Sequence, residues 1–195
     1  MENIVNEPLL QKRFASVDEY LQIESMDNLR YELINGKINT IDGASLNHNQ
    51  IVSNLICEIG YFLKGKDYEI FASKLRVNIP LINSFAYPDI SIVSGKSVLS
   101  EHYFDSLLNP SVIIEVLSPA TESYDRGDKL FAYQHIRALN QYILIDSASL
   151  NIQSITKKDD GLWKFENITD AAALLTISTI NQQLPLADIY DGLTY

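Results

Sequence analysis

The sequence predicts an α/β (α+β) fold in which helices flank a central mixed β-sheet and β-hairpins are added around it. Three observations predict it: short apolar runs suited to buried strands, two segments with helical spacing, and two strand pairs separated by turn residues. With 195 residues, 46% of them hydrophobic, the chain can bury one core of ordinary size. We therefore expect a single domain over 1–195, with a core of about 16–167 and a C-terminal extension, 168–195.

The N-terminal elements are expected to be a short helix and a tight hairpin. Ser16 followed three residues later by Glu19 is a capping box, which marks the start of a helix. Asn35-Gly36 separates two strand-like segments, 29–34 and 37–41. This pair is well suited to the positive φ angles of a two-residue turn, so the sequence predicts a β-hairpin here.

A long helix and a series of strands supply the centre of the predicted fold. From 48 to 64 the apolar residues recur at three- and four-residue intervals, which predicts an amphipathic helix lying against the sheet. The strand-like segments are 68–72, 75–79, 88–93, 112–117 and 142–146. We expect one mixed sheet, with a loop and a short helix in 94–111 and a second covering helix over 125–137. Two last strands, 152–156 and 162–166, predict a second hairpin.

Composition and charge argue against a membrane protein, a secreted protein and binding of nucleic acid through overall positive charge. No run approaches the roughly 18 apolar residues of a membrane span, and the start of the chain lacks signal-peptide features, so a cytoplasmic protein without a membrane partner is expected. A single cysteine, Cys57, excludes an intrachain disulfide. The net charge of −10 opposes nucleic-acid binding by bulk electrostatics. A locally basic segment remains, formed by Lys64, Lys66, Lys74 and Arg76.

Two carboxylates stand in segments that otherwise have the composition of buried strands. Glu115 lies in the middle of the apolar run 112–117, and Asp89 opens the strand that follows Pro88. Burying a carboxylate is costly unless it is neutralised, paired or bound to a metal, so both are candidate functional groups. If the two strands are neighbours, the acids meet and supply the hard oxygen ligands that Mg²⁺ (or Mn²⁺) prefers.

A third acid and a lysine are expected to complete this site. Glu32 lies in the first strand of the hairpin and joins the metal ligands if that strand reaches the same edge. Lys129 stands on the helix after the Glu115 strand, where an ammonium could orient the attacking water and stabilise charge on a phosphate. The candidate catalytic residues are therefore Glu32, Asp89, Glu115 and Lys129, with Asp89, Glu115 and Glu32 as metal ligands.

The same residues also allow purely structural roles. Glu115 could belong to a buried ion pair, and Asp89 could be a strand-start residue after a proline. Glu32 could face solvent on an edge hairpin, and Lys129 could pair with the acid four residues before it on an exposed helix face. His48 is left outside the site, because a histidine at a helix start is usually only partly buried.

Four motifs, in order, resemble those of the PD-(D/E)XK nuclease superfamily, and within it the putative restriction endonuclease family of unknown biological role. They are Tyr31-Glu32-Leu33-Ile34-Asn35-Gly36, Pro88-Asp89, Glu115-Val116-Leu117-Ser118-Pro119, and a helix with Asp125, Lys129 and Tyr133. His48, Ile51 and Leu55 match a further helix of that family. The superfamily normally has a lysine two residues after the second acid, where this chain has Leu117.

This resemblance implies a restriction-endonuclease-like core over roughly 16–167. It implies that Asp89 and Glu115 bind Mg²⁺, that Glu32 supports them, and that Lys129 is the catalytic lysine displaced onto the helix. The expected activity is that of a Mg²⁺-dependent endonuclease, which hydrolyses DNA phosphodiester bonds with metal-activated water. A homodimer is a further hypothesis. Two alternatives stay open: a catalytically inactive nuclease-fold module for binding or assembly, and a carboxylate-pair hydrolase acting on sugars.

Overall fold

The computed structural model describes residues 14–26, 29–41, 43–72, 75–103 and 105–193. Within these ranges the centre is a six-stranded mixed sheet, in the order β11-β10-β9-β8-β6-β3. Its strands are Tyr68–Ala72 (β3), Ile90–Ser94 (β6), Val112–Leu117 (β8), Gln141–Asp146 (β9), Ile152–Lys157 (β10) and Trp163–Ile168 (β11). β8 and β9 run parallel, and the other neighbouring strands run antiparallel. The predicted central mixed sheet is confirmed.

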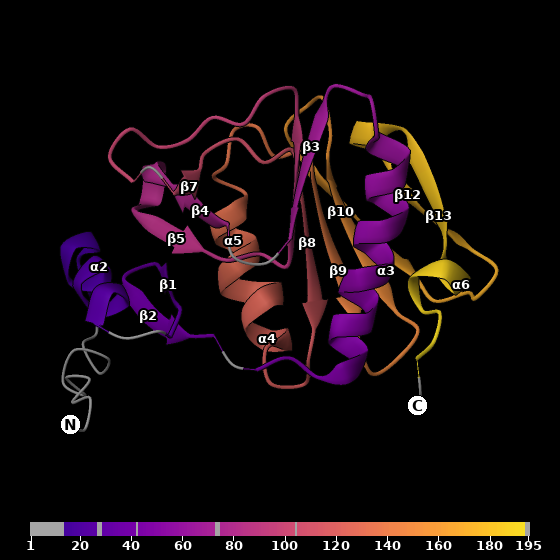
Figure 1. Cartoon of the computed structure of the whole chain (residues 1–195), viewed down its shortest axis with the longest axis horizontal. Helices are drawn as coiled ribbons and strands as arrows, with labels where there is room; N and C mark the ends of the chain where they lie inside the picture. The colour runs from indigo at the N-terminus through magenta and orange to yellow at the C-terminus, as the bar shows by residue number, and fades with distance from the viewer. Residues whose placement is uncertain (1–13, 27–28, 42, 73–74, 104, 194–195) are drawn as a thin grey trace.

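Helices cover both faces of this sheet. Helix α3, Leu46–Leu63, lies on one face, and the segment with helices α4, Glu122–Tyr124, and α5, Leu130–Tyr133, lies on the other (Figure 1). The side chains of β8 alternate between two cores. Val112, Ile114 and Val116 pack with α3, whereas Ile113 and Leu117 pack with α5. Glu115 has the parity of Ile113 and Leu117, so it points to the α5 side, as its place in the apolar run requires.

A second sheet carries the N-terminal hairpin. Its order among the described residues is β2-β1-β5-β4-β7. The strands are Tyr31–Ile34 (β1), Lys37–Thr40 (β2), Arg76–Ile79 (β4), Ser84–Ala86 (β5) and Ser106–Leu107 (β7). Helix α2, Val17–Met26, covers its outer face through a small core that includes Tyr20, Tyr31 and Phe85. The predicted hairpin is confirmed, with φ of 50° at Asn35 and 76° at Gly36.

The expectation of a single sheet was wrong. β5 was not anticipated, and it pairs with both β1 and β4, which joins those strands into a sheet of their own. Pro88 then follows between β5 and β6, and because proline lacks the N–H needed for a ladder bond, it separates the two strands. The chain therefore passes from one sheet to the other at Pro88, immediately before Asp89.

Two helices also differ from expectation. In the described part of 94–111 there is no helix; Leu99 instead forms a β-bridge with Leu107. The second covering helix starts at Glu122, passes through a π-helical turn at Asp125–Lys129 and ends at Tyr133. A π-helical turn inserts extra residues into a helix and shifts its register, which helical periodicity alone cannot anticipate.

The C-terminal extension packs on the α3 side of the molecule. It consists of the hairpin Leu174–Ile177 (β12) and Gln182–Pro185 (β13) followed by helix α6, Leu186–Ile189, and Figure 1 shows these elements beside α3. Its apolar side chains belong to the same core as those of α3; they include Leu175, Ile177, Leu184, Leu186 and Ile189. None of the helices described is both long and apolar enough to cross a bilayer.

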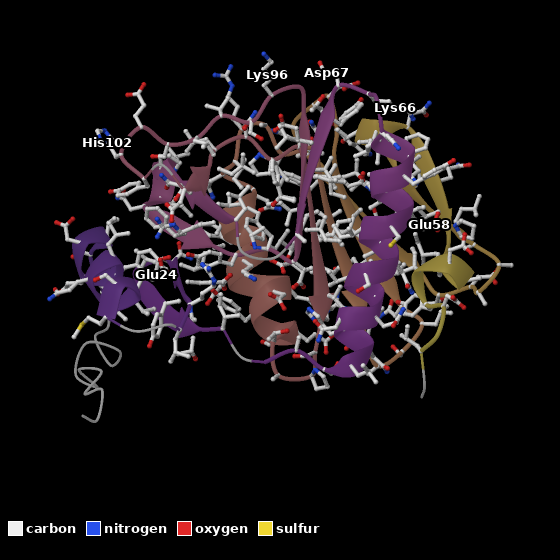
Figure 2. The ribbon with its side chains drawn as sticks, in the orientation of Figure 1. Glu24, Glu58, Lys66, Asp67, Lys96 and His102 are labelled. Atoms are coloured by element: carbon white, nitrogen blue, oxygen red, sulfur yellow. The ribbon has the colours of Figure 1, made fainter. Side chains whose placement is uncertain are left out.

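Arg76 is part of the interior and not of a basic surface. Its guanidinium contacts Glu24 on α2 (2.7 Å) and Asp105 (2.6 Å), and its Nε donates to Ser106 Oγ (2.9 Å). Figure 2 shows Glu24 where α2 meets the second sheet. Lys74 lies outside the described residues. The locally basic segment expected from the sequence therefore loses Arg76, which is only 5% exposed.

Replacing Arg76 with methionine should lower the free energy of unfolding by about 3 kcal/mol, because Glu24, whose side chain is only 13% exposed, would lose its cation. Urea denaturation followed by circular dichroism measures the change. Lys37→Met is the matched control: Lys37 is exposed and 3.9 Å from Asp128, so its loss should change stability by less than about 0.5 kcal/mol. Equal effects of the two substitutions would contradict the structural role given to Arg76.

Candidate active site

Acids from four parts of the chain meet at one cavity of about 330 Å³. Its walls include Glu32, Asp89, Glu115 and Lys129, together with His48, Tyr124 and Asp125. The structure therefore brings together all four residues that the sequence suggested.

The register of β6 and β8 places the two central acids side by side. Ile90 is paired with Ile114 in this antiparallel ladder. Asp89, which precedes Ile90, therefore lies opposite Glu115, which follows Ile114. The Asp89 amide donates to Glu115 Oε2 (3.2 Å), and the Val116 amide donates to Asp89 Oδ2 (2.8 Å). Each carboxylate is thus fixed by the backbone of the other strand.

Lys129 lies between three carboxylates. Its Nζ is 2.8 Å from Glu115 Oε1, 3.1 Å from Glu32 Oε1 and 3.4 Å from Asp125 Oδ1. The π-helical turn begins at Asp125 and ends at Lys129, and both residues are buried. The side chain of Lys129 is only 7% exposed, so it does not lie on a solvated helix face.

Glu32 reaches the cavity from the second sheet. It is 3% exposed, and its Oε1 accepts a hydrogen bond from the Tyr87 amide (2.8 Å). The Tyr87 hydroxyl in turn donates to Glu24 Oε1 (2.9 Å), the partner of Arg76. Burial and the neighbouring Glu24 raise the pKa of Tyr87 to about 12, so its hydroxyl remains a donor. Glu32 is therefore held inside the molecule and not on the outer face of a hairpin.

Burial dominates the electrostatics of this cluster. It raises the pKa of Glu115 well above its usual range; Lys129 opposes this rise, and the charge of Asp89 adds to it. Burial alone would lower the pKa of Lys129, but Glu115 and Glu32 raise it well above the usual range, so the lysine stays charged. Burial also raises the pKa of Asp125. Carboxylates outnumber cationic groups here, which favours the binding of a further cation.

Sequence reasoning left His48 outside the site, but the structure places it there. Its Nε2 lies 3.0 Å from Asp89 Oδ1, on the side of Asp89 that Val116 leaves open. Burial lowers the pKa of His48, but the hydrogen bond and the charge of Asp89 together raise it above the usual value. A signal was present in the sequence, since His48 stands three and seven residues before Ile51 and Leu55, on the inner side of α3.

Tyr133 was noted only as part of a motif, yet it contacts the central acid directly. Its hydroxyl donates to Glu115 Oε1 (2.8 Å), beside the contact from Lys129. Burial and the charge of Glu115 raise the pKa of Tyr133 well above its usual range, so the phenol stays protonated. The spacing of Asp125, Lys129 and Tyr133 at four-residue intervals was the available signal.

The donor set suits a hard divalent cation. Mg²⁺ is commonly held by one or two carboxylates together with waters and substrate phosphate, and Asp89 and Glu115 could supply those carboxylates. Within the described ranges, no three His, Cys, Asp or Glu side chains already surround one point. The chemistry therefore fits an ion held in part by solvent or substrate, and not a closed protein cage.

A mixed sheet with an acidic cavity beside two of its inner strands, β6 and β8, and a lysine from the following helix is typical of the restriction-endonuclease-like, nuclease-type class. The chain belongs to the Uma2 family, described as "Putative restriction endonuclease", whose model matches residues 17–187. The resemblance inferred from the four motifs is thereby confirmed. The match also runs past residue 167, the expected limit of the core, into the C-terminal extension.

Two relatives and one solved structure match most of the chain. An uncharacterised protein of Synechocystis sp., slr1290, is 34% identical over 183 residues, which is 92% of this chain and 93% of that protein. A second one, sll1609, is 34% identical over 151 residues, or 77% and 85% of the two chains. The crystal structure of a putative nuclease belonging to DUF820 from Anabaena variabilis matches with a TM-score of 0.75 at 21% identity, covering 90% of this chain and 97% of that one. At this identity, the structural match establishes a common fold.

Replacing Lys129 with methionine should make stability strongly pH-dependent. A carboxyl whose pKa is raised in the folded state binds its proton more tightly there than in the unfolded chain. The stability that this contributes is fully present below the unfolded pKa and is lost as the pH rises through the folded pKa. Without Lys129 the pKa of Glu115 rises further, so K129M should be close to wild-type stability near pH 5 and lose about 3–5 kcal/mol at pH 8.

Urea unfolding at several pH values measures this effect, and the double variant K129M/E115Q is the control. Because that variant has no carboxyl at position 115 but keeps the buried Asp125, its stability should vary less with pH than that of K129M. A K129M profile parallel to that of the wild type would contradict the buried ion pair between Lys129 and Glu115.

Proposed function

We propose that this protein is a divalent-metal-dependent endonuclease that hydrolyses phosphodiester bonds in DNA. The observation that carries the proposal is the meeting of Asp89, Glu115 and Lys129 at one cavity, in a chain that belongs to a family of nuclease type. Carboxylates with an adjacent ammonium are suited to phosphoryl transfer, because that reaction needs a positioned water and stabilisation of charge on the phosphate oxygens.

In this proposal Asp89 and Glu115 hold Mg²⁺ or Mn²⁺, and Glu32 is a supporting acid. When bound, the ion supplies a Lewis acid and a water of lowered pKa. His48 and the Val116 amide fix the two oxygens of Asp89. These contacts keep Asp89 in place before a substrate arrives.

Lys129 and Tyr133 act from the other side of Glu115. Of the three carboxylate contacts of Lys129, the one to Asp125 is the longest, at 3.4 Å. Lys129 therefore has one N–H that can turn to the attacking water or a phosphate oxygen while it keeps Glu115 and Glu32. Tyr133 donates to Glu115 Oε1 and holds that carboxylate in its rotamer.

A second candidate is a binding or assembly module that has the nuclease fold without its catalysis. The contacts of Lys129 favour it: the ammonium already neutralises Glu115 and Glu32, so the cluster is satisfied in part without any metal. Leu117, where the superfamily normally has its lysine, points the same way. Metal binding and cleavage distinguish the two candidates.

Cleavage of DNA is the first test. Purified protein incubated with supercoiled, linear and single-stranded DNA and Mg²⁺ or Mn²⁺ should produce nicks or breaks, separated on gels. Glu115→Gln should reduce the rate by on the order of a thousandfold, because it removes a carboxylate from the reacting centre. Glu58→Gln is the matched control: Glu58 is an exposed glutamate of α3 (Figure 2) that does not line the cavity, and its change should leave the rate unaltered. Cleavage that persists in E115Q would remove the proposed role of Glu115.

Metal binding and its pH dependence form the second test. Calorimetric titration with Mn²⁺ should show binding that weakens as the pH falls from 8 to 6, since Glu115, with its raised pKa, must lose its proton to bind a metal. Asp89→Asn should weaken binding at both pH values, whereas E58Q should match the wild type. An absence of heat and of thermal stabilisation at pH 8 would favour the inactive module over the enzyme.

A further inference from the structure

The free edge of β11 carries unpaired backbone groups. β11 ends the central sheet, and the Lys158 amide donates to the Leu162 carbonyl (2.8 Å) just before the strand starts. Residues 158 and 162 are thus a hydrogen-bonded pair, and such pairs alternate with non-bonded pairs along an antiparallel ladder. The even-numbered residues of β11 therefore bond to β10. Trp163, Phe165 and Asn167 therefore present their N–H and C=O groups to the free edge. Across the described ranges, no other segment bonds to these backbone groups.

The side chains at this edge are also accessible. Lys164 and Glu166 are half exposed, Phe165 is 53% exposed, and Leu162 beside the strand is 66% exposed. A six-residue edge strand without a covering element readily pairs with another strand, and natural proteins usually block such an edge.

One register lets β11 pair with β11 of a second copy. If two such strands run antiparallel about Phe165, residue 165 lies opposite residue 165, and Trp163 lies opposite Asn167 of the second copy. All three outward-facing residues then meet outward-facing residues, so their N–H and C=O groups bond to each other. A shift by one residue would place outward groups against groups already bonded to β10.

This register is also complementary in charge. Lys164 lies opposite Glu166 of the second copy, and Glu166 lies opposite its Lys164. Both are non-hydrogen-bonded pairs, in which side chains come closest. Within one chain Lys164 Nζ is already 2.6 Å from Glu166 Oε1, so two copies would form a ring of four alternating charges. On the other face of the sheet the two Phe165 rings meet at the two-fold axis.

We propose that β11 is a homodimer interface at which two copies of this chain pair antiparallel about Phe165 and join their two central sheets into one continuous sheet. A second copy is the partner because the strand is complementary to itself: the pairing that joins its free backbone groups also joins each charge to its opposite. Symmetric pairing of one patch with itself is the usual basis of two-fold dimers.

The interface does not overlap the candidate active site. β9 and β10 separate β11 from β8, the strand of Glu115. In the proposed dimer the two β8 strands would therefore be separated by β9, β10 and β11 of both copies. The dimer does not depend on the proposed nuclease activity.

Charge exchange tests the interface. Light scattering after gel filtration of the full chain should give a mass of about twice the 22.0 kDa of one chain. Lys164→Glu places like charges opposite each other at two symmetric positions and should weaken the dimer at least about tenfold in dissociation constant, and Glu166→Lys should do the same. The double variant K164E/E166K reverses both charges and should dimerise like the wild type.

Mixing the two single variants gives the sharpest result. K164E and E166K, each largely monomeric, should form a heterodimer when mixed. The glutamate introduced at position 164 of one copy then faces the lysine introduced at position 166 of the other, and the native Glu166 of the first copy faces the native Lys164 of the second. Circular dichroism checks that each variant is folded.

Three results would count against this interface. A wild-type protein that stays at the 22.0 kDa of one chain over a dilution series overturns the proposal, as do single variants that dimerise like the wild type. A mixture of the two single variants that stays monomeric overturns the proposed register.

Discussion

The buried contact between Lys129 and Glu115 is the constraint on which the site depends. Both side chains are almost fully buried, and their Nζ and Oε1 atoms are 2.8 Å apart. Removing two ions from water costs several kcal/mol each, and well-packed apolar residues in their place are often as stabilising or more so. The pair is therefore poorly explained by stability alone. A chemical task for the Lys129–Glu115 pair, such as the proposed hydrolysis, gives a reason for its presence.

The second sheet positions a further partner of Lys129, because Glu32 lies on its strand β1. This sheet is fixed to α2 by a series of contacts that runs from Arg76 through Glu24 and Tyr87 to Glu32. Every step of this path is a charge-assisted or buried hydrogen bond, and such bonds hold a geometry more tightly than apolar packing does. The cavity thus has one wall from the central sheet and one from the second sheet, and the passage at Pro88 joins the two.

Local signals allowed much of the fold to be predicted, and long-range pairing decided the rest. The capping box at Ser16, the turn at Asn35-Gly36 and the run 112–117 depend on neighbours in sequence, and all three occur as expected. The three-residue strand β5 is defined by its partners β1 and β4, so no local pattern marked it. For the site, buried acids were visible as exceptions in apolar runs. His48 was left out because its role arises from contact with Asp89, 41 residues away.

The charge of the protein bears on how DNA could reach such a site. The chain carries a net charge of −10, Arg76 is internal, and at the cavity carboxylates outnumber cationic groups. A phosphate diester brought to this cavity would meet repulsion from Asp89 and Glu115 before any contact with Lys129. In the proposed function, neutralisation of these acids by a divalent ion is then needed for substrate binding as well as for the reaction. Affinity for DNA would be coupled to metal occupancy, since each favours the state in which the other binds.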